Sequence, residues 1–171
     1  MKIRVNKEER QKRLNEIVEE RKQKEIIQQA IQKENEVKIL LQEVFGEMEL
    51  FEILDSNTTN SIVEDFSENF PIAFWNRINW KNAIVNRVEL NDQGIKSIPS
   101  LLISKGFDTS IPIYIFWGYD NHPCVKTKLT EELLSNIEDI VWLGNDLYLY
   151  CPTQKYVIEF FHDDTVNIGW I

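Results

Sequence analysis

The C-terminal stretch DLYLYCPTQKYVIEFFHDDTVNIGWI, residues 146–171, contains the strongest strand signal in the chain. Tyr, Val, Ile and Phe dominate it, and these residue types favour strands. Two short connectors interrupt it, and the second, Asp163-Asp164, has the length of a tight hairpin loop. The stretch therefore predicts an antiparallel meander of three strands, over residues 147–151, 156–162 and 166–170.

The preceding segment adds two strands and one helix to this meander. Residues 111–119 form a continuous apolar run, which is typical of a strand buried on both faces, and a turn leads from it into residues 124–129. Thr130 precedes two glutamates and is a suitable N-cap for a helix that continues to about Trp142. Helices followed by strands indicate an α+β fold, with helices on one face of a mostly antiparallel sheet of about five strands.

The N-terminal third of the chain predicts one long helix. Residues 6–54 contain no proline and a single glycine, Gly46, and strong helix formers dominate them. Apolar residues are sparse and change face in the first half, whereas residues 37–51 have the spacing of a wide apolar face. We therefore expect a charged helical arm over residues 1–38 and a single α+β domain over residues 39–171.

The charge of the chain is divided unevenly between these two parts. The 171 residues include 19 Lys and Arg against 28 Asp and Glu, a net charge of −9, and 43% are hydrophobic. Residues 1–38 contain 11 basic and 8 acidic side chains, a net charge of +3, which leaves −12 for the domain. This balance argues against nucleic acid as the partner. The domain's charge either serves solubility or attracts a basic partner.

Cysteine usage and hydropathy point to a cytoplasmic protein with no membrane contact. The two cysteines, Cys124 and Cys151, are too few for a disulfide framework and show no metal-finger spacing. No window approaches the length of a membrane span, and the chain starts with charged residues rather than with the apolar core of a signal peptide.

No sequence motif indicates an enzyme. Phosphate-binding glycine motifs, H-E-x-x-H and G-x-S-x-G are all missing from the sequence. His122 and His162 could join either cysteine in a nucleophilic pair, but no spacing indicates that they meet. The two aspartates after His162 would point to opposite faces of an extended chain, which leaves too few converging metal ligands. We therefore expect no catalytic residues, no metal site and no cofactor.

One strand brings a carboxylate to a face with apolar neighbours. Because side chains alternate along a strand, Glu159 shares one side with Val157 and Phe161. Such a carboxylate is either an ion-paired core group or part of a recognition surface. Each aromatic residue of this region could simply lie in the hydrophobic core. Their large number, however, favours at least one that is exposed and binds a partner.

The segment from Asp146 to Trp170 resembles the C-terminal part of small bacterial immunity proteins that accompany polymorphic toxins, including those of contact-dependent growth inhibition. The shared features are an acidic residue that opens a strand, a central glutamate in the next strand, a His/Asp turn, and a final strand that contains Gly169. The resemblance extends over residues 111–171, with a weaker match in residues 74–80. It implies a protein that neutralises a toxin and has no catalytic residues.

This resemblance and the negative domain lead to one mechanistic expectation. A toxin that acts on nucleic acid has a basic surface, and an acidic inhibitor would bind that surface and occlude it. The partner would be a cognate, basic protein toxin, with a nuclease as one candidate. The residues expected to contact it are Asp120, Asp146, Glu159, Asp163, Asp164, Trp117 and Trp170.

Two other classes of function remain open at this point. An adaptor or assembly protein would use the N-terminal helix for coiled-coil or docking contacts, including self-association. A small hydrolase or transferase would need a nucleophile among the cysteines and histidines named above.

Overall fold

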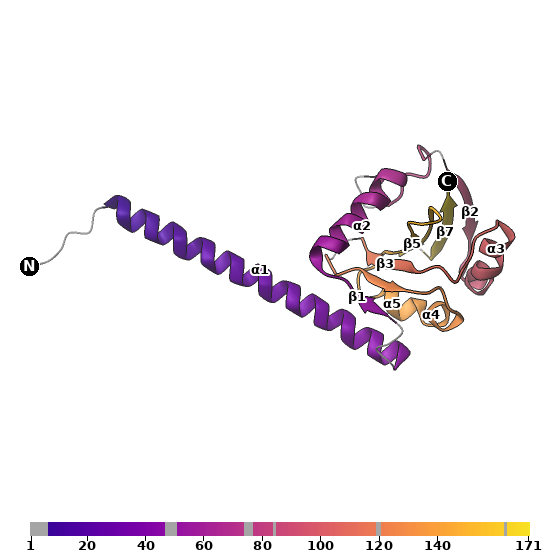
Figure 1. Ribbon diagram of the computed structural model, residues 1–171, viewed down its shortest axis with the longest axis horizontal. Coiled ribbons are helices and arrows are strands. Elements are labelled where there is room, and N and C mark those ends of the chain that lie inside the picture. Colours follow the sequence, from indigo (N-terminus) through magenta and orange to yellow (C-terminus); the bar gives the residue numbers. More distant parts are fainter. Residues whose placement is uncertain (1–6, 47–50, 74–76, 84, 119–120, 163) are drawn as a thin grey trace, which may run out of the picture.

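The computed structural model describes residues 7–46, 51–73, 77–83, 85–118, 121–162 and 164–171 (Figure 1). It contains one long N-terminal helix that extends away from a body in which helices surround a sheet. This confirms the predicted α+β class.

Helix α1 (Lys7–Phe45) is the longest element and is only partly attached to the body. Every residue from Lys7 to Gln32 is exposed, a length of about 39 Å at 1.5 Å per residue. Val37 and Leu41 are the fully buried residues of the helix, and they attach its C-terminal part to the core. The helix is followed by Gly46, whose φ of 67° lies in the left-handed region that glycine adopts without strain.

The sheet has seven strands in the order β1-β4-β3-β5-β6-β7-β2, and every neighbouring pair is antiparallel. The strands are β1 (Glu52–Ile53), β2 (Asn86–Leu90), β3 (Ile113–Trp117), β4 (Val125–Thr127), β5 (Leu147–Cys151), β6 (Tyr156–Phe161) and β7 (Thr165–Trp170). The predicted C-terminal meander is therefore β5-β6-β7. The two strands beyond the five expected are the edge strands β1 and β2. The first has only two residues and the second has a mostly polar sequence, so neither gives an apolar signal.

Within the described residues, five shorter helical segments accompany α1 and the sheet. They are α2 (Ser56–Asn69), the 3-10 helix η2 (Asp92–Ser97), α3 (Ile98–Ser104), α4 (Glu131–Ser135) and α5 (Ile137–Val141). Asp55 caps α2, and its carboxylate accepts hydrogen bonds from the backbone N–H groups of Asn57 and Thr58. The helix predicted after Thr130 is present as α4 and α5, which are separated at Asn136.

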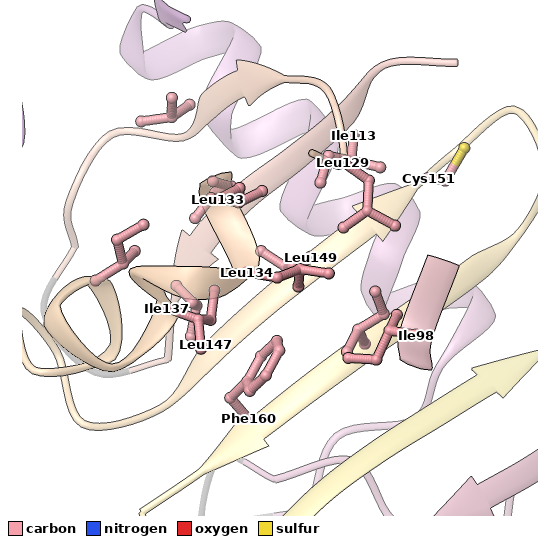
Figure 2. Close-up of a cluster of buried hydrophobic side chains, with 14 of the residues drawn as sticks. Ile98, Ile113, Leu129, Leu133, Leu134, Ile137, Leu147, Leu149, Cys151 and Phe160 are labelled. Carbon is pink, nitrogen blue, oxygen red and sulfur yellow. The ribbon is translucent and has the colours of Figure 1, made fainter. Parts of the chain in front are cut away.

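Hydrophobic clusters lie on both faces of the sheet because the strand side chains alternate. Leu147 and Leu149 of β5 belong to one cluster, which α1, α3, α4 and α5 cover (Figure 2). Tyr148 and Tyr150 belong to the other cluster, against which Phe66 of α2 packs. The expectation that all helices lie on one face was therefore incomplete: the strands are apolar on both sides, and α2 covers the second side.

The described residues include no helix with the combined length and apolarity needed to cross a membrane.

Candidate functional site

Three of the residues expected to bind a partner lie at one end of the sheet. Trp117 ends β3 and pairs with Leu147, which directly follows Asp146. Asp164 is an exposed residue of the turn between β6 and β7 at the same end. Two further expected residues lie outside the part of the chain that the structure describes: Asp120 and Asp163.

The side chain of Asp146 points inward and supports the fold at this end of the sheet. It is completely buried. Its Oδ1 atom accepts a hydrogen bond from the backbone N–H of His162 at 3.2 Å and lies 3.0 Å from Nδ1 of the same residue. The carboxylate therefore joins the start of β5 to the residue after β6, and it is not exposed for contact with a partner.

Glu159 is likewise completely buried, on the face of the sheet that α2 covers. Its Oε1 atom accepts a hydrogen bond from the backbone N–H of Ile78 at 3.0 Å. Its Oε2 atom accepts hydrogen bonds from Nε1 of Trp80 at 2.6 Å and from Nδ2 of Asn167 at 3.0 Å, and Nε of Arg77 lies 3.5 Å away. Burial raises the pKa of this carboxyl group, although its hydrogen bonds and Arg77 act in the opposite direction. Of the two interpretations left open by the sequence, the structure shows the ion-paired core group.

The two tryptophans expected as anchors are also tied into the molecule. Trp117 is 5% exposed, and its Nε1 donates a hydrogen bond to the carbonyl oxygen of Ile140 at 2.8 Å. It packs so closely on Gly144 that a Cβ there would lie 2.8 Å from its own Cβ. Trp170 is half-buried at the opposite end of the sheet, where its ring lies 5.5 Å from Nζ of Lys105.

The most exposed large apolar side chain of the described residues is Trp142, at 80%. It follows α5, whose Ile137 and Ile140 are buried in the core. At 3.6 residues per turn, position 142 lies more than half a turn from position 140 and therefore faces away from the core. The sequence predicts that the helix ends at about this tryptophan but assigns the tryptophan to no surface, although its spacing from Ile137 and Ile140 is the signal that could have done so.

Trp142 borders a cavity of about 340 Å³ at this end of the sheet, which we call the sheet-end pocket. Its lining includes Glu138, Trp142, Phe161, His162, Asp164 and Thr165. Asp139, next to Glu138 on α5, is also exposed. No Lys or Arg occurs among the described residues that line the pocket. The arrangement therefore combines an exposed aromatic side chain with acidic neighbours.

The cysteines are placed as structural residues. Both are free and buried, and they belong to the clusters on opposite faces of the sheet. Burial raises the pKa of Cys124 to about 12, which keeps this thiol protonated near neutral pH, whereas a nucleophilic cysteine needs the thiolate. Within the described ranges, no group of three or more His, Cys, Asp or Glu is arranged to hold a metal ion.

Comparison with known proteins shows that this protein is a toxin-neutralising immunity protein. The model of the family described as "CdiI immunity protein EcoliA0-like" matches residues 40–169, and no curated protein matches the chain. The chain therefore belongs to the CdiI immunity protein family, whose members act in contact-dependent growth inhibition. This confirms the resemblance found in residues 111–171. The matched range contains the sheet-end pocket and all of the sheet except Trp170, the last residue of β7, and the exposed part of α1 precedes it.

Proposed function

We propose that this immunity protein neutralises its cognate toxin by occlusion, and that the sheet-end pocket is a surface of contact. The observation that carries the proposal is the 80% exposure of Trp142 beside the carboxylates of Glu138 and Asp164. Large aromatic side chains are strongly enriched among the residues that dominate binding energy, and charged residues typically surround them. A tryptophan with so little intramolecular contact is available for that role.

Electrostatics favour a basic surface on the toxin. The chain has a net charge of −9, Glu138 and Asp164 line the sheet-end pocket with Trp142, and Asp139, next to Glu138 in α5, is exposed. Complementary charge accelerates encounter and fixes the orientation of the partners. A toxin that binds phosphates, such as a nuclease, would present such a basic surface. Asp120, which follows β3 in the sequence, and Asp163, which directly precedes Asp164, stay in the proposed contact set with Asp164.

Within this proposal, the other residues expected to bind the toxin do not contact it at the sheet-end pocket. Asp146 and Glu159 hold the strands and connectors that carry the surface, and Trp117 fixes α5 to the sheet. Trp142 takes the anchor role first expected of Trp117 or Trp170. The protein would act without a chemical reaction and without nucleic acid or membrane as partner, because occlusion needs only a stable contact with the toxin.

The test is the affinity of Trp142→Ala for the purified cognate toxin domain, measured by isothermal titration calorimetry. We expect the Kd to rise about 30-fold, which corresponds to about 2 kcal/mol for a residue that dominates binding. The thermal unfolding temperature should stay within about 2 °C of the wild type, since surface substitutions change stability by less than about 0.5 kcal/mol.

A matched control is Ile103→Ala on α3, because Ile103 is also highly exposed, at 60%, and lies outside the sheet-end pocket. Its Kd should equal that of the wild type. If Trp142→Ala binds the toxin as tightly as the wild type does, the sheet-end pocket is not the contact surface.

A further inference from the structure

A larger cleft lies between the base of the arm and helix α2. It has a volume of about 660 Å³, and we call it the arm cleft. Phe66, Phe116 and Tyr148 form its apolar floor, with ring centroids of Phe66 and Phe116 4.9 Å apart and those of Phe66 and Tyr148 5.1 Å apart. Ala30 and Glu34 of α1 line its other side. The arm cleft and the sheet-end pocket share no lining residue, so they are separate surfaces.

The exposed part of α1 extends the apolar wall of this cleft. Ala30 lies seven residues before the buried Val37, which is close to two helical turns, and Ile26 lies eleven residues before it, close to three turns. Ile27 lies fourteen residues before the buried Leu41, close to four turns. These three residues therefore face the same side as the attached part of the helix. Ile26 and Ile27 are each 57% exposed, so none of the residues that the structure describes covers this apolar side.

A second copy of the chain is a poorer occupant for this side of the arm. Ile17 lies twenty residues before Val37, about five and a half turns, and therefore points to the opposite side of the helix. The exposed apolar residues near the start of α1 and those near its middle consequently do not form one straight seam. A coiled coil needs such a continuous seam.

The charge at the rim of the arm cleft identifies a more suitable occupant. Glu34, Asp55 and Glu64 line the cleft, and no Lys or Arg does so among the described residues. Hydrogen bonds from Thr58 lower the pKa of Asp55, so this carboxylate is ionised near neutral pH. His122, also in the lining and 5% exposed, lies with Nε2 3.5 Å from Oε2 of Glu36 and so connects the base of the arm to the loop after β3. The cleft thus combines an apolar floor and wall with a negative rim.

We propose that the arm cleft binds a basic segment of the cognate toxin, and that α1 lies along this segment. Apolar side chains of the segment would pack on Phe66, Ile26 and Ile27, and its Lys or Arg side chains would meet Glu34 and Glu64. The inference rests on the proposed binding of a toxin but not on the sheet-end pocket. Contact at two separate surfaces of one immunity protein gives a tighter complex than either surface alone, because the second contact forms within the same complex.

The first test reverses the charge of the cleft in the full-length chain. We expect Glu34→Lys/Glu64→Lys to weaken binding of the cognate toxin domain at least tenfold in calorimetry. The matched control is Glu43→Lys/Glu68→Lys, which makes the same change in net charge on the same two helices at exposed positions outside the cleft. This control should stay within threefold of the wild type. Equal weakening by both variants would mean that net charge rather than the cleft matters, and would overturn the proposal.

The second test addresses the side of the arm that makes the contact. Ile26→Glu/Ile27→Glu should weaken toxin binding at least tenfold, whereas Leu14→Glu/Ile17→Glu should leave it unchanged. Light scattering on the same samples measures the oligomeric state. If the wild type is a dimer that Leu14→Glu/Ile17→Glu dissociates, and toxin binding follows the dimer, the arm is a self-association element and the proposal is wrong.

The outcomes also separate this inference from the proposed function. If the wild type binds the toxin and Trp142→Ala weakens binding while Glu34→Lys/Glu64→Lys and Ile26→Glu/Ile27→Glu do not, only the arm cleft is excluded. If the wild type does not bind the toxin, the proposed function and the proposed role of the arm cleft are both overturned.

Discussion

Four carboxylates near the C-terminus form an inner and an outer pair with opposite surroundings, which we call the inner and the outer group. Glu159 and Asp146 are completely buried, and each has hydrogen-bond partners from other segments of the chain. Glu138 and Asp164 are exposed beside the sheet-end pocket, and no described Lys or Arg lines that pocket with them. All four lie within the last 34 residues, so position in the sequence does not separate them.

This contrast shows which positions of such a fold can supply an acidic surface. A carboxylate within or directly before a central strand is enclosed by the layers on both faces of the sheet, and it persists there only with hydrogen-bond partners. A carboxylate on a short helix or in a hairpin turn reaches solvent at the end of the sheet. The inner group therefore stabilises the scaffold, and the outer group supplies the charge that a partner meets.

The largest effect that tests this division is expected for Glu159→Ala. The substitution leaves the N–H groups of Trp80, Ile78 and Asn167 without their acceptor in a buried environment. Removing one partner of a buried charged network typically costs about 3 to 5 kcal/mol. Urea denaturation followed by far-ultraviolet circular dichroism should therefore show a loss of this size in the free energy of unfolding.

The toxin affinity of the remaining folded protein provides the counterpart measurement. At a temperature where Glu159→Ala is folded, the Kd should stay within about threefold of the wild type, because the carboxylate does not reach the surface. A normal free energy of unfolding together with a large loss of affinity would assign Glu159 to the toxin contact and would contradict the division.

The elements of the fold with a strong apolar signal were predictable from sequence. The β5-β6-β7 meander, β3 and the long helix follow from runs of β-branched and aromatic residues or of helix formers. The edge strand β2 was not predicted, because NRVEL contains only two apolar residues and resembles a polar loop. The position of α2 on the second face depends on tertiary packing of Phe66 against Tyr148 and Tyr150, which no local pattern encodes.

The sequence predicts the residue types of the candidate site, acidic and aromatic, better than it predicts which individual residues are exposed there. The alternation of side chains along β6 correctly predicts that Glu159 lies on the same face of the sheet as Val157. It did not show that Ile78 and Trp80, about 80 positions away in the sequence, bring donors that enclose this carboxylate. Trp142, in contrast, was within reach of helical periodicity, because its neighbours Ile137 and Ile140 define the buried side of α5.

A smaller effect is expected for the outer group, in the salt dependence of association. Exposed charges are screened as the Debye length falls from about 30 Å at 0.01 M to about 8 Å at 0.15 M ionic strength. If Glu138 and Asp164 steer a basic toxin, the association rate constant of the wild type should fall about tenfold over this range in stopped-flow measurements. The variant Glu138→Lys/Asp164→Lys should show a much flatter dependence, while its dissociation rate changes less.

Glu43→Lys/Glu68→Lys is again the matched control, since it alters the net charge equally at positions away from the sheet-end pocket. It should keep most of the wild-type salt dependence. The same flattening in both variants would show that the overall charge of the chain, rather than the outer group, governs encounter.

The smallest expected effect concerns the protonation state of Glu159 in the folded protein. Burial raises the pKa of Glu159 above its ordinary value of 4.5, so the folded protein retains this proton at pH values where the unfolded chain has lost it. The stabilising contribution of the carboxyl group is therefore complete below pH 4.5 and is lost as pH rises through the raised pKa. We expect the free energy of unfolding of the wild type, minus that of Glu159→Gln, to fall as pH increases from 4 to 8.

Other carboxylates, such as Asp55 and Asp65, titrate in both proteins, so their contributions largely cancel in this difference. A difference that instead grows with pH would mean that the hydrogen bonds of Trp80, Ile78 and Asn167 favour the ionised form more than burial opposes it.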